Sequence, residues 1–336
     1  MKKRILTLTL AAALMAVPLA GCGAQEQAQE QEQVQETVDF TEMEEQGAMV
    51  DLGALLDEGV PLAGAPVGGV LPTTAPGTQV EENSSALVDY SNAKDGYVMA
   101  KWLAGGSDRV KVLVKGPSTT TYQYNLNLNG DYEAFPLSDG SGAYIVGVYK
   151  NISGSEYATI LSATVNTTLT DEFAPFLRPN QYVNFSEGST AVAKAAELCA
   201  GASDNLSKVE PIYTYVVNNV TYDTQKAETV ASGYLPNVDE TLATGKGICF
   251  DYAALMAAML RSQGVPVKLV VGYTGSAYHA WLSVYSETDG WIEGKIYFDG
   301  TEWKLMDPTF ASSSNSSESV MQYIGNGSNY SAKYLY

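Results

Sequence analysis

The sequence contains few of the residues from which metal sites and disulfide frameworks are built. Its 336 residues include three cysteines and one histidine. Three cysteines exclude a domain held together mainly by disulfides and a zinc site with four thiolate ligands. One histidine excludes sites that need two, such as the H-E-x-x-H motif. The ligands are too few for a metal site, and we expect no cofactor.

Basic residues are also scarce. Lysine and arginine together number 19 against 38 aspartates and glutamates, which gives a net charge of −19. Because binding to phosphates needs a basic face, this balance argues against nucleic acid as the main partner. It argues equally against binding to anionic lipid by charge alone.

The N-terminus has the layout of a secretory signal, with Lys2, Lys3 and Arg4 before an apolar run over residues 5–20. The run is too short to predict a membrane span. It leads into Leu-Ala-Gly-Cys, which resembles the bacterial lipobox, with Cys22 as the lipidated first residue of the mature chain. We therefore expect an extracytoplasmic protein, lipid-anchored to a bacterial membrane. The alternative is an ordinary signal peptide in which Cys22 has no such role.

A segment of biased composition follows. No lysine or arginine occurs between Cys22 and Ala93. Residues 25–36 are nearly all Gln and Glu and cannot bury enough apolar surface to fold alone. Residues 61–77 are rich in Pro, Gly, Ala and Thr, which is typical of a flexible spacer. We interpret this segment as a tether that holds the folded domains away from a membrane.

Alternation of apolar and polar residues dominates from about residue 84 to residue 169 and predicts short strands separated by turns. The candidate strands are 97–103, 109–114, 120–128, 142–149 and 157–165. Strands at this spacing indicate a small sandwich or barrel. The few charged residues of this unit do not form a pattern that suggests catalysis. We therefore interpret the unit as a spacer or as a module that binds glycan or protein.

A second unit contains helices and the candidate nucleophile. Helices are expected at 190–200 and 204–217, with Pro211 limiting or kinking the second. Two glycines before Cys249 and a strong helix-forming run after it place this cysteine in the first turn of a helix. The exposed amides of a first turn favour thiolate over thiol and can donate to an oxyanion. Position alone makes Cys249 a plausible nucleophile.

We expect structural roles for two residues close to Cys249 in the sequence and for a second cysteine. We expect Asp251 and Tyr252 to fix the start of the helix and to pack beneath the site. Cys199 lies on a predicted helix and is interpreted as buried and inert. A disulfide between Cys199 and Cys249 would block catalysis, and we do not favour it.

A histidine and a carboxylate follow on predicted strands. His279 opens an alternating strand over 279–285, and Asp307 ends the strand predicted at 302–306. Neighbouring antiparallel strands place such residues side by side, and a helix packed on the sheet can present Cys249 to His279. Cysteine, histidine and carboxylate together form a nucleophile, a base and a group that orients the base.

These motifs resemble a known family. Gly-Ile-Cys-Phe-Asp-Tyr-Ala, then His-Ala-Trp, then Trp-x-x-x-Asp-Pro-Thr are similar to the transglutaminase-like superfamily in its bacterial secreted branch, over roughly residues 209–310. The resemblance implies a papain-like core with a central antiparallel sheet. It also implies Cys249 as the nucleophile, His279 as general base and acid, and Asp307 as the orienting group. Members commonly use an upstream side chain in the oxyanion hole, and Tyr222 is our candidate for it.

The predicted fold class is therefore α+β, with a transglutaminase-core domain preceded by a small all-β sandwich-like domain. The expected segments are a lipoprotein signal peptide over 1–21, a disordered tether over 22–83, the β-rich domain over 84–170, the transglutaminase-like domain over 171–310 and a Ser/Asn-rich tail over 311–336.

The expected reaction is acyl transfer from a protein or peptide amide through a thioester. Resolution of the thioester by water gives a protease or amidase, and resolution by an amine gives a crosslink. Two alternatives need no catalysis in this domain. In the first, the transglutaminase-like domain is a degenerate scaffold that binds cell-surface or wall proteins. In the second, the β-rich unit carries the function and the transglutaminase-like domain only supports it.

Overall fold

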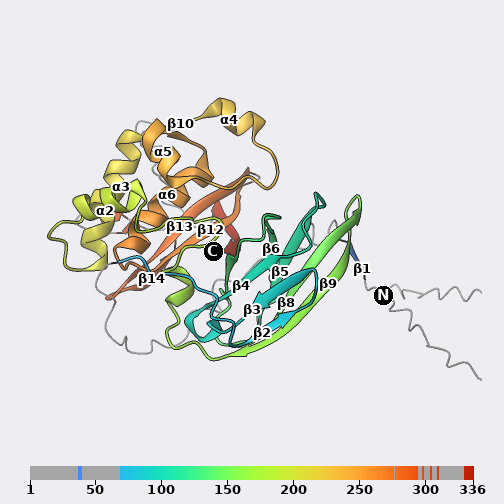
Figure 1. Cartoon of the computed structure of the whole chain (residues 1–336). Helices are drawn as coiled ribbons and strands as arrows, with labels where there is room; N and C mark the ends of the chain where they lie inside the picture. Colours follow the sequence, from blue (N-terminus) through green and yellow to red (C-terminus); the bar gives the residue numbers. More distant parts are fainter. Residues whose placement is uncertain are drawn as a thin grey trace, which may run out of the picture. The chain divides into compact units, whose positions relative to one another are not determined.

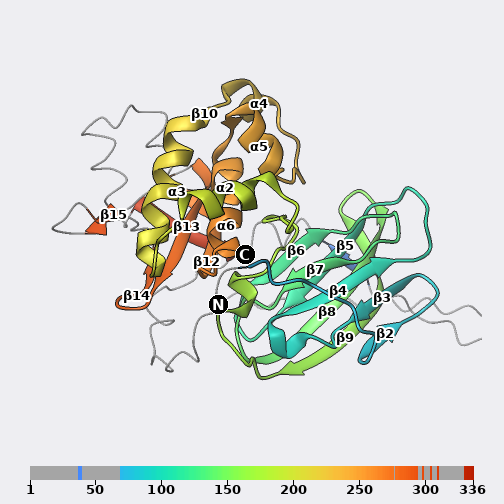
Figure 2. The ribbon, with the colours of Figure 1, turned by 60° about the vertical axis from the view of Figure 1, so that its left-hand side comes forward.

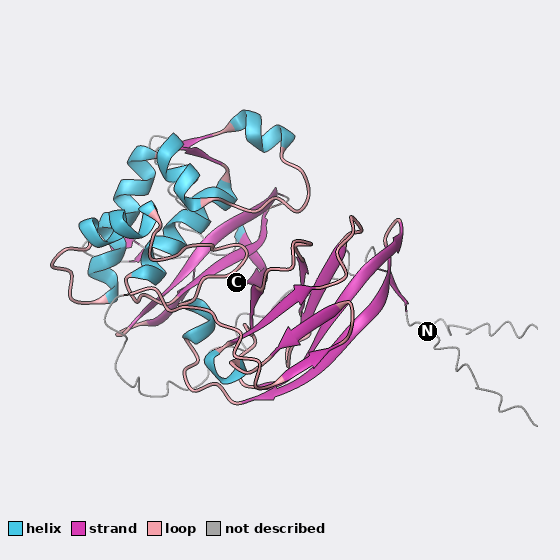
Figure 3. Ribbon diagram, in the orientation of Figure 1, coloured by secondary structure: helices cyan, strands magenta, loops and turns pink. Residues whose placement is uncertain are grey.

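The computed structural model describes residues 37–39, 69–275, 277–293, 297–298, 303–304, 309 and 329–336. Antiparallel β-sheets come first along the chain, and a region of helices and a further sheet follows (Figures 1 and 3). The predicted α+β class, with its β-rich part first, is confirmed.

Two antiparallel sheets form the β-rich part. One has the order β1-β9-β8-β5-β6 and the other has the order β2-β3-β4-β7. The strands of the first are β1 (Thr37–Asp39), β9 (Glu156–Thr167), β8 (Gly142–Ser153), β5 (Val110–Lys115) and β6 (Thr121–Asn125). Those of the second are β2 (Val80–Glu82), β3 (Ala86–Asp89), β4 (Tyr97–Trp102) and β7 (Glu133–Pro136). Alternate side chains of both sheets, such as Val88, Val98, Val112 and Val146, are buried in one core.

All five strands that alternation predicts are present, with shifted ends. β8 and β9 are longer than expected because they pair with each other along nearly their whole length. β1 and β2 lie within the segment expected to be a tether, and β1 pairs with β9. These are very short strands, for which alternation gives no usable signal.

Five α-helices lie in the described residues that follow the sandwich: α2 (Thr190–Leu198), α3 (Asn205–Asn219), α4 (Thr224–Thr229), α5 (Val238–Thr244) and α6 (Cys249–Ser262). Pro211 lies inside α3, and the helix continues for eight more residues to Asn219, so this proline does not end it. In the described ranges, no helix is both long and apolar enough to cross a membrane.

Helix α6 is the centre of this region. Every residue from 251 to 262 is buried, and the helix packs against α2, α3 and α5 as well as the sheet (Figure 2). The sheet is antiparallel, with the order β14-β13-β12-β17. Its strands are β14 (Gly290–Glu293), β13 (Ala277–Ser286), β12 (Val267–Thr274) and β17 (Tyr330–Leu335). A helix buried on all sides holds its first residue in a fixed place, which matters because that residue is Cys249.

The two faces of the sheet carry different residues. Leu269, Val271, Ala280 and Leu282 belong to the main core that contains α6. Val270, Trp281, Ala332 and Leu335 form a separate cluster with Phe176. Since successive residues of a strand point to opposite faces, each of the two faces has its own apolar cover.

Strand β17 joins the sheet at its edge, although its residues were expected in a C-terminal tail. It pairs with β12 through a register shift at Val271 and Gly272. A Cβ added at Gly272 would lie 2.1 Å from the backbone oxygen of Ser331, so β17 can approach only because this residue is glycine. Arg261, buried in α6, donates at 2.6 Å to the carbonyl oxygen of Tyr336, directly after the strand.

Candidate active site

Cys249 is the first residue of α6, as predicted. The residue is half-buried, and its thiol is not part of a disulfide. Strand β11 (Lys246–Gly247) leads into the helix. A Cβ at Gly247 would lie 2.6 Å from the Cβ of Asp251, so glycine is needed for the chain to enter the helix this closely. The cysteine therefore has the amides of a first helical turn around it and solvent within reach.

Tyr222, the candidate oxyanion donor, lies beside this entry. Strand β10 (Thr221–Tyr222) pairs in parallel with β11, and Tyr222 is opposite Gly247. The backbone N–H of Asp223 donates to the carbonyl oxygen of Gly247 at 2.9 Å. The exposed Tyr222 ring thus lies on the strand next to the residues that precede the nucleophile.

His279 is the third residue of β13, not the first as predicted. Ala277 and Tyr278 precede it in the strand because they pair with Thr274 and Tyr273 across a tight hairpin. The imidazole is buried and lies near two aromatic rings, with ring centroids 6.2 Å apart for Trp281 and 6.4 Å apart for Tyr330.

The pairing of β12 with β13 decides on which face of the sheet the side chain of His279 lies. It shares that face with Trp281, whereas Ala280 packs on the other side with α6. His279 therefore lies on the face of the sheet that α6 does not cover, and the packing of α6 on the sheet does not by itself bring Cys249 close to His279. After α6 the chain reverses into β12, so the start of the helix and the β12–β13 hairpin lie at the same end. A contact between the side chains of Cys249 and His279 would have to form at this end of the sheet, outside the packed core.

Two predicted site residues, Asp307 and Cys22, lie outside the described residues. The described part of the strand before Asp307 is β16 (Trp303–Lys304), which pairs with β15 (Tyr297–Phe298). β13 has β14 and β12 as its paired neighbours. The expected direct pairing of the Trp303 strand with the His279 strand is thus not present among the described residues.

Aromatic side chains that the sequence did not single out surround the start of α6. Tyr278 is 58% exposed, and its ring meets that of Tyr273 with centroids 5.4 Å apart. Burial of its hydroxyl raises the pKa of Tyr278, and the neighbouring tyrosines and Cys249 raise it further. Phe250 contacts Tyr182 at 5.5 Å between ring centroids. Tyr278, which interacts electrostatically with Cys249, and Phe250, the next residue in the chain, thus bring aromatic rings to the start of α6.

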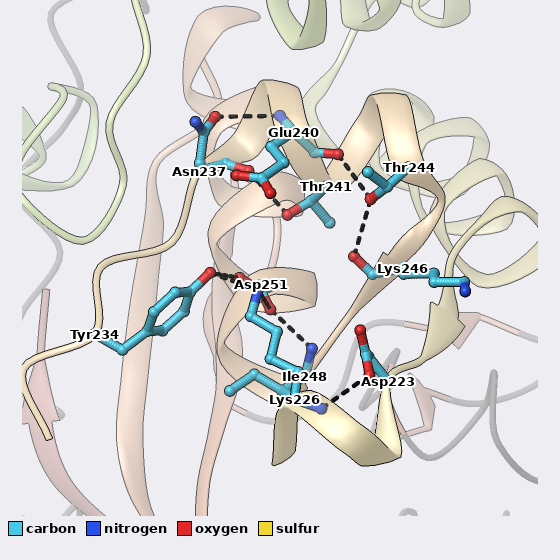
Figure 4. Close-up of polar contacts among 10 residues, drawn as sticks. All are labelled: Asp223, Lys226, Tyr234, Asn237, Glu240, Thr241, Thr244, Lys246, Ile248 and Asp251. Atoms are coloured by element: carbon cyan, nitrogen blue, oxygen red, sulfur yellow. Dashed lines mark hydrogen bonds and ion pairs between the residues drawn. The ribbon is translucent and has the colours of Figure 1, made fainter. Parts of the chain in front are cut away.

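Three polar side chains form a cluster at the same helix end, which we call the Asp251 clasp: Lys226, Tyr234 and Asp251 (Figure 4). Asp251 has no exposed surface. Its Oδ2 accepts the N–H of Ile248 at 2.8 Å and lies 2.7 Å from the Nζ of Lys226. Its Oδ1 accepts the hydroxyl of Tyr234 at 2.6 Å. The prediction that Asp251 fixes the helix start is confirmed.

The clasp shifts the protonation of its members. Burial works against the charge of Lys226, but its hydrogen bonds to Asp251 and Tyr234 outweigh burial, and its pKa is raised. Burial, followed by the hydrogen bond to Asp251, raises the pKa of Tyr234 to about 12. At neutral pH the clasp therefore holds an ammonium and a neutral phenol around the buried carboxyl group.

Cys199 is more buried than Cys249. It is buried at the end of α2, its Sγ donates to the carbonyl oxygen of Lys208 at 3.7 Å, and burial raises its pKa. Cys199 and Cys249 are both free cysteines in this structure. Within the described ranges, no three His, Cys, Asp or Glu side chains lie close enough together to hold a metal ion.

Residues 192–308 match the family model of the transglutaminase-like superfamily. The chain therefore carries a transglutaminase-like superfamily domain, and the resemblance drawn from the three motifs is confirmed at this level.

Particular relatives match over part of the chain. "Uncharacterized protein YebA" of Bacillus subtilis is 32% identical over 117 residues, which cover 32% of this chain and 16% of the relative. "UPF0252 protein MJ1282" of Methanocaldococcus jannaschii is 27% identical over 166 residues, which cover 44% of this chain and 47% of the relative. The chain thus spans less than half the length of either. A crystal structure described as "a Putative Cysteine Protease" from Cytophaga hutchinsonii aligns over 72% of this chain and 79% of its own, with a TM-score of 0.37 and 16% identity.

Proposed function

We propose that this protein is a cysteine-dependent acyltransferase or amide hydrolase that acts on protein or peptide substrates. The observation that supports it is the position of Cys249, a half-buried free cysteine on the first residue of a helix that is buried from residue 251 onward, within a transglutaminase-like domain. A buried helix holds the sulfur in place, and the first-turn amides point to where an oxyanion would form. Rigid support of this kind is what a nucleophile needs.

In the proposed reaction the Cys249 thiolate attacks the carbonyl carbon of the substrate amide. The carbonyl oxygen becomes an oxyanion that accepts hydrogen bonds from first-turn amides and, in this proposal, from the hydroxyl of Tyr222. Protonated His279 gives its proton to the leaving nitrogen as the C–N bond breaks, which releases an amine and leaves a thioester. Water or a primary amine then attacks the thioester, and His279 takes its proton. The C–S bond breaks, which releases a carboxylic acid or a new amide and regenerates the Cys249 thiolate. Asp307 is assigned the orientation of His279.

The test offers two substrates and reads two products. A labelled primary amine with a glutamine-rich protein reports amine transfer, and a peptide library reports hydrolysis by mass spectrometry. We expect at least one product, and we expect Cys249→Ala to abolish it while Cys199→Ala retains it. A product that survives Cys249→Ala would refute the proposed nucleophile.

We further propose that lipid on Cys22 anchors the protein outside the bacterial cytoplasm. Its support is the Leu-Ala-Gly-Cys segment after a charged and apolar leader. In a bacterial host fed an alkyne fatty acid, the wild-type protein should take up label and sediment with membranes. Cys22→Ala should do neither, and equal labelling of both proteins would contradict the anchor.

A further inference from the structure

The buried side chain of Asp251 lies in the same first turn of α6 as Cys249. Asp251 lies two residues after Cys249, and its side chain turns back so that Oδ2 lies 2.8 Å from the backbone nitrogen of Ile248, the residue before Cys249. Carboxylate and thiol therefore belong to the same helical turn. A nearby negative charge disfavours the formation of a thiolate, which is the reactive form of cysteine.

The same carboxylate is useful for folding. Negative charge at a helix N-terminus is favourable, and the hydrogen bond to Ile248 satisfies an amide that the helix leaves without a partner. The side chain has no exposed surface, however, so water does not screen its charge. Burial of a carboxylate without a paired cation is strongly unfavourable.

Lys226 supplies that cation from a separate element. It lies on α4, and its Nζ is 2.7 Å from Oδ2 of Asp251. The same Nζ donates to the hydroxyl of Tyr234 at 2.6 Å, and that hydroxyl donates to Oδ1 of Asp251. Both carboxylate oxygens are thus engaged, and the side chains in Figure 4 converge on them from α4 and from the chain before α5.

We propose that Lys226 is a positioning residue whose ammonium cancels the charge of the buried Asp251 and so leaves the thiol of Cys249 free to ionise. This proposal rests on the proposed function, since it gives a purpose to the reactivity of Cys249. Lys226 acts through Asp251 and need not touch the substrate. Its effect is electrostatic, which distinguishes it from a residue that only holds the fold together.

Other ionisable groups around this helix start contribute a background that the test leaves unchanged. Asp223 accepts the backbone N–H of Lys226 at 2.9 Å and so caps α4. Among the described residues, Tyr222 lies on β10, Lys246 on β11, and Tyr278 and His279 on β13. The ring of Tyr182 contacts Phe250 in the same first turn.

The test measures alkylation of Cys249 by iodoacetamide between pH 4 and pH 10, with each cysteine followed by peptide mass spectrometry. Lys226→Met leaves an uncompensated carboxylate and should raise the midpoint pH of alkylation by about one unit. Asp251→Asn leaves an uncompensated ammonium and should lower the midpoint. The double variant has neither charge and should return close to the wild-type midpoint. Lys226→Arg keeps the charge and should stay there as well.

Opposite shifts of the two single variants are the decisive result, because loss of structure alone would move both midpoints in the same direction. Lys150→Met is the matched control, since Lys150 forms a 2.8 Å ion pair with Asp108 in the β-rich part, and it should not shift the midpoint. If Lys226→Met does not fold, Asp251→Asn and the double variant still decide, because the second must lie above the first.

The failure of this inference is distinguishable from the failure of the proposed function. A wild-type midpoint well below that of an ordinary thiol, together with variants that do not move it, overturns the role of Lys226 and leaves the nucleophile in place. An ordinary midpoint that still moves in opposite directions supports the charge coupling and counts against Cys249 as an activated nucleophile.

Discussion

The substitution Gly272→Ala tests whether the last strand of the sheet depends on a missing side chain. The added Cβ would lie 2.1 Å from the carbonyl oxygen of Ser331, 2.9 Å from the Trp281 ring and 3.0 Å from the Cα of Ala332. The nearest of these atoms is backbone, so it cannot rotate away, and β17 has to retreat by roughly an ångström to reach ordinary contact distance. Overpacking of this kind costs about 1–3 kcal/mol, and the rigid backbone contact favours the upper end.

In a folding unit of this size we expect the melting temperature to fall by about 5–10 °C. Thermal and urea unfolding followed by tryptophan fluorescence would measure it. Activity should fall too, because Tyr330 on β17 lies beside His279, with ring centroids 6.4 Å apart. Gly188→Ala is the matched control, since its Cβ would meet only the Ser186 hydroxyl oxygen at 3.9 Å.

The reasoning is refuted if Gly272→Ala melts together with Gly188→Ala. The source of strain can be checked as well. Because the nearest clashing atom belongs to the backbone, Ser331→Ala should not rescue Gly272→Ala. A rescue would show that the side chain of Ser331, and not the path of the strand, causes the strain.

Two further predictions concern the buried polar groups. Arg261→Met should lower the free energy of unfolding by about 3 kcal/mol or more in urea titrations. It removes the guanidinium donor from the carbonyl oxygens of Arg178 and Val267, and it leaves the backbone oxygen of Tyr336 with the N–H of Leu269. A loss below about 1 kcal/mol would contradict this prediction. The half-buried Tyr182 and Tyr234 both have pKa values raised to about 12 in the folded state. Their stabilising effect is therefore fully present below pH ~10 and is lost as the pH rises from about 10 to 12. Exposed tyrosines such as Tyr222 and Tyr273 ionise in the folded protein, so only part of the tyrosinate absorbance at 295 nm should wait for unfolding. Complete ionisation of the tyrosines in the still-folded protein would contradict this prediction.

The parts of the fold that were predictable are those with strong local patterns. The strands of the sandwich alternate over five or more residues, and the run after Cys249 combines glycines with helix-forming residues, so both were visible. Helices α4 and α5 were missed because they span only six and seven residues and depend on single capping side chains, Asp223 and Asn237. A helix of two turns carries too little periodicity to be recognised.

Strand β17 shows a different limit. Tyr330–Leu335 pairs with Val270–Thr274, about sixty residues earlier in the chain, and the pairing depends on a glycine that accepts a close backbone. Neither segment carries information about the other. The ring of Tyr330 beside His279 could therefore not have been placed from the sequence, although His279 itself was identified from its motif.

The first turn of α6 contains one residue that local sequence rules explain and depends on another that comes from a distant segment. The third position of a helix favours an acidic residue, so local rules account for Asp251 without reference to function. Those rules also place a carboxylate in the same helical turn as Cys249, where a thiolate is needed. Stability and reactivity then impose opposite demands on one site, and no substitution at position 251 satisfies both. A cation from another element does, and Lys226 lies 25 residues earlier, on a helix that local patterns do not reveal. The residue that reconciles the two demands is therefore the one that only the fold could identify.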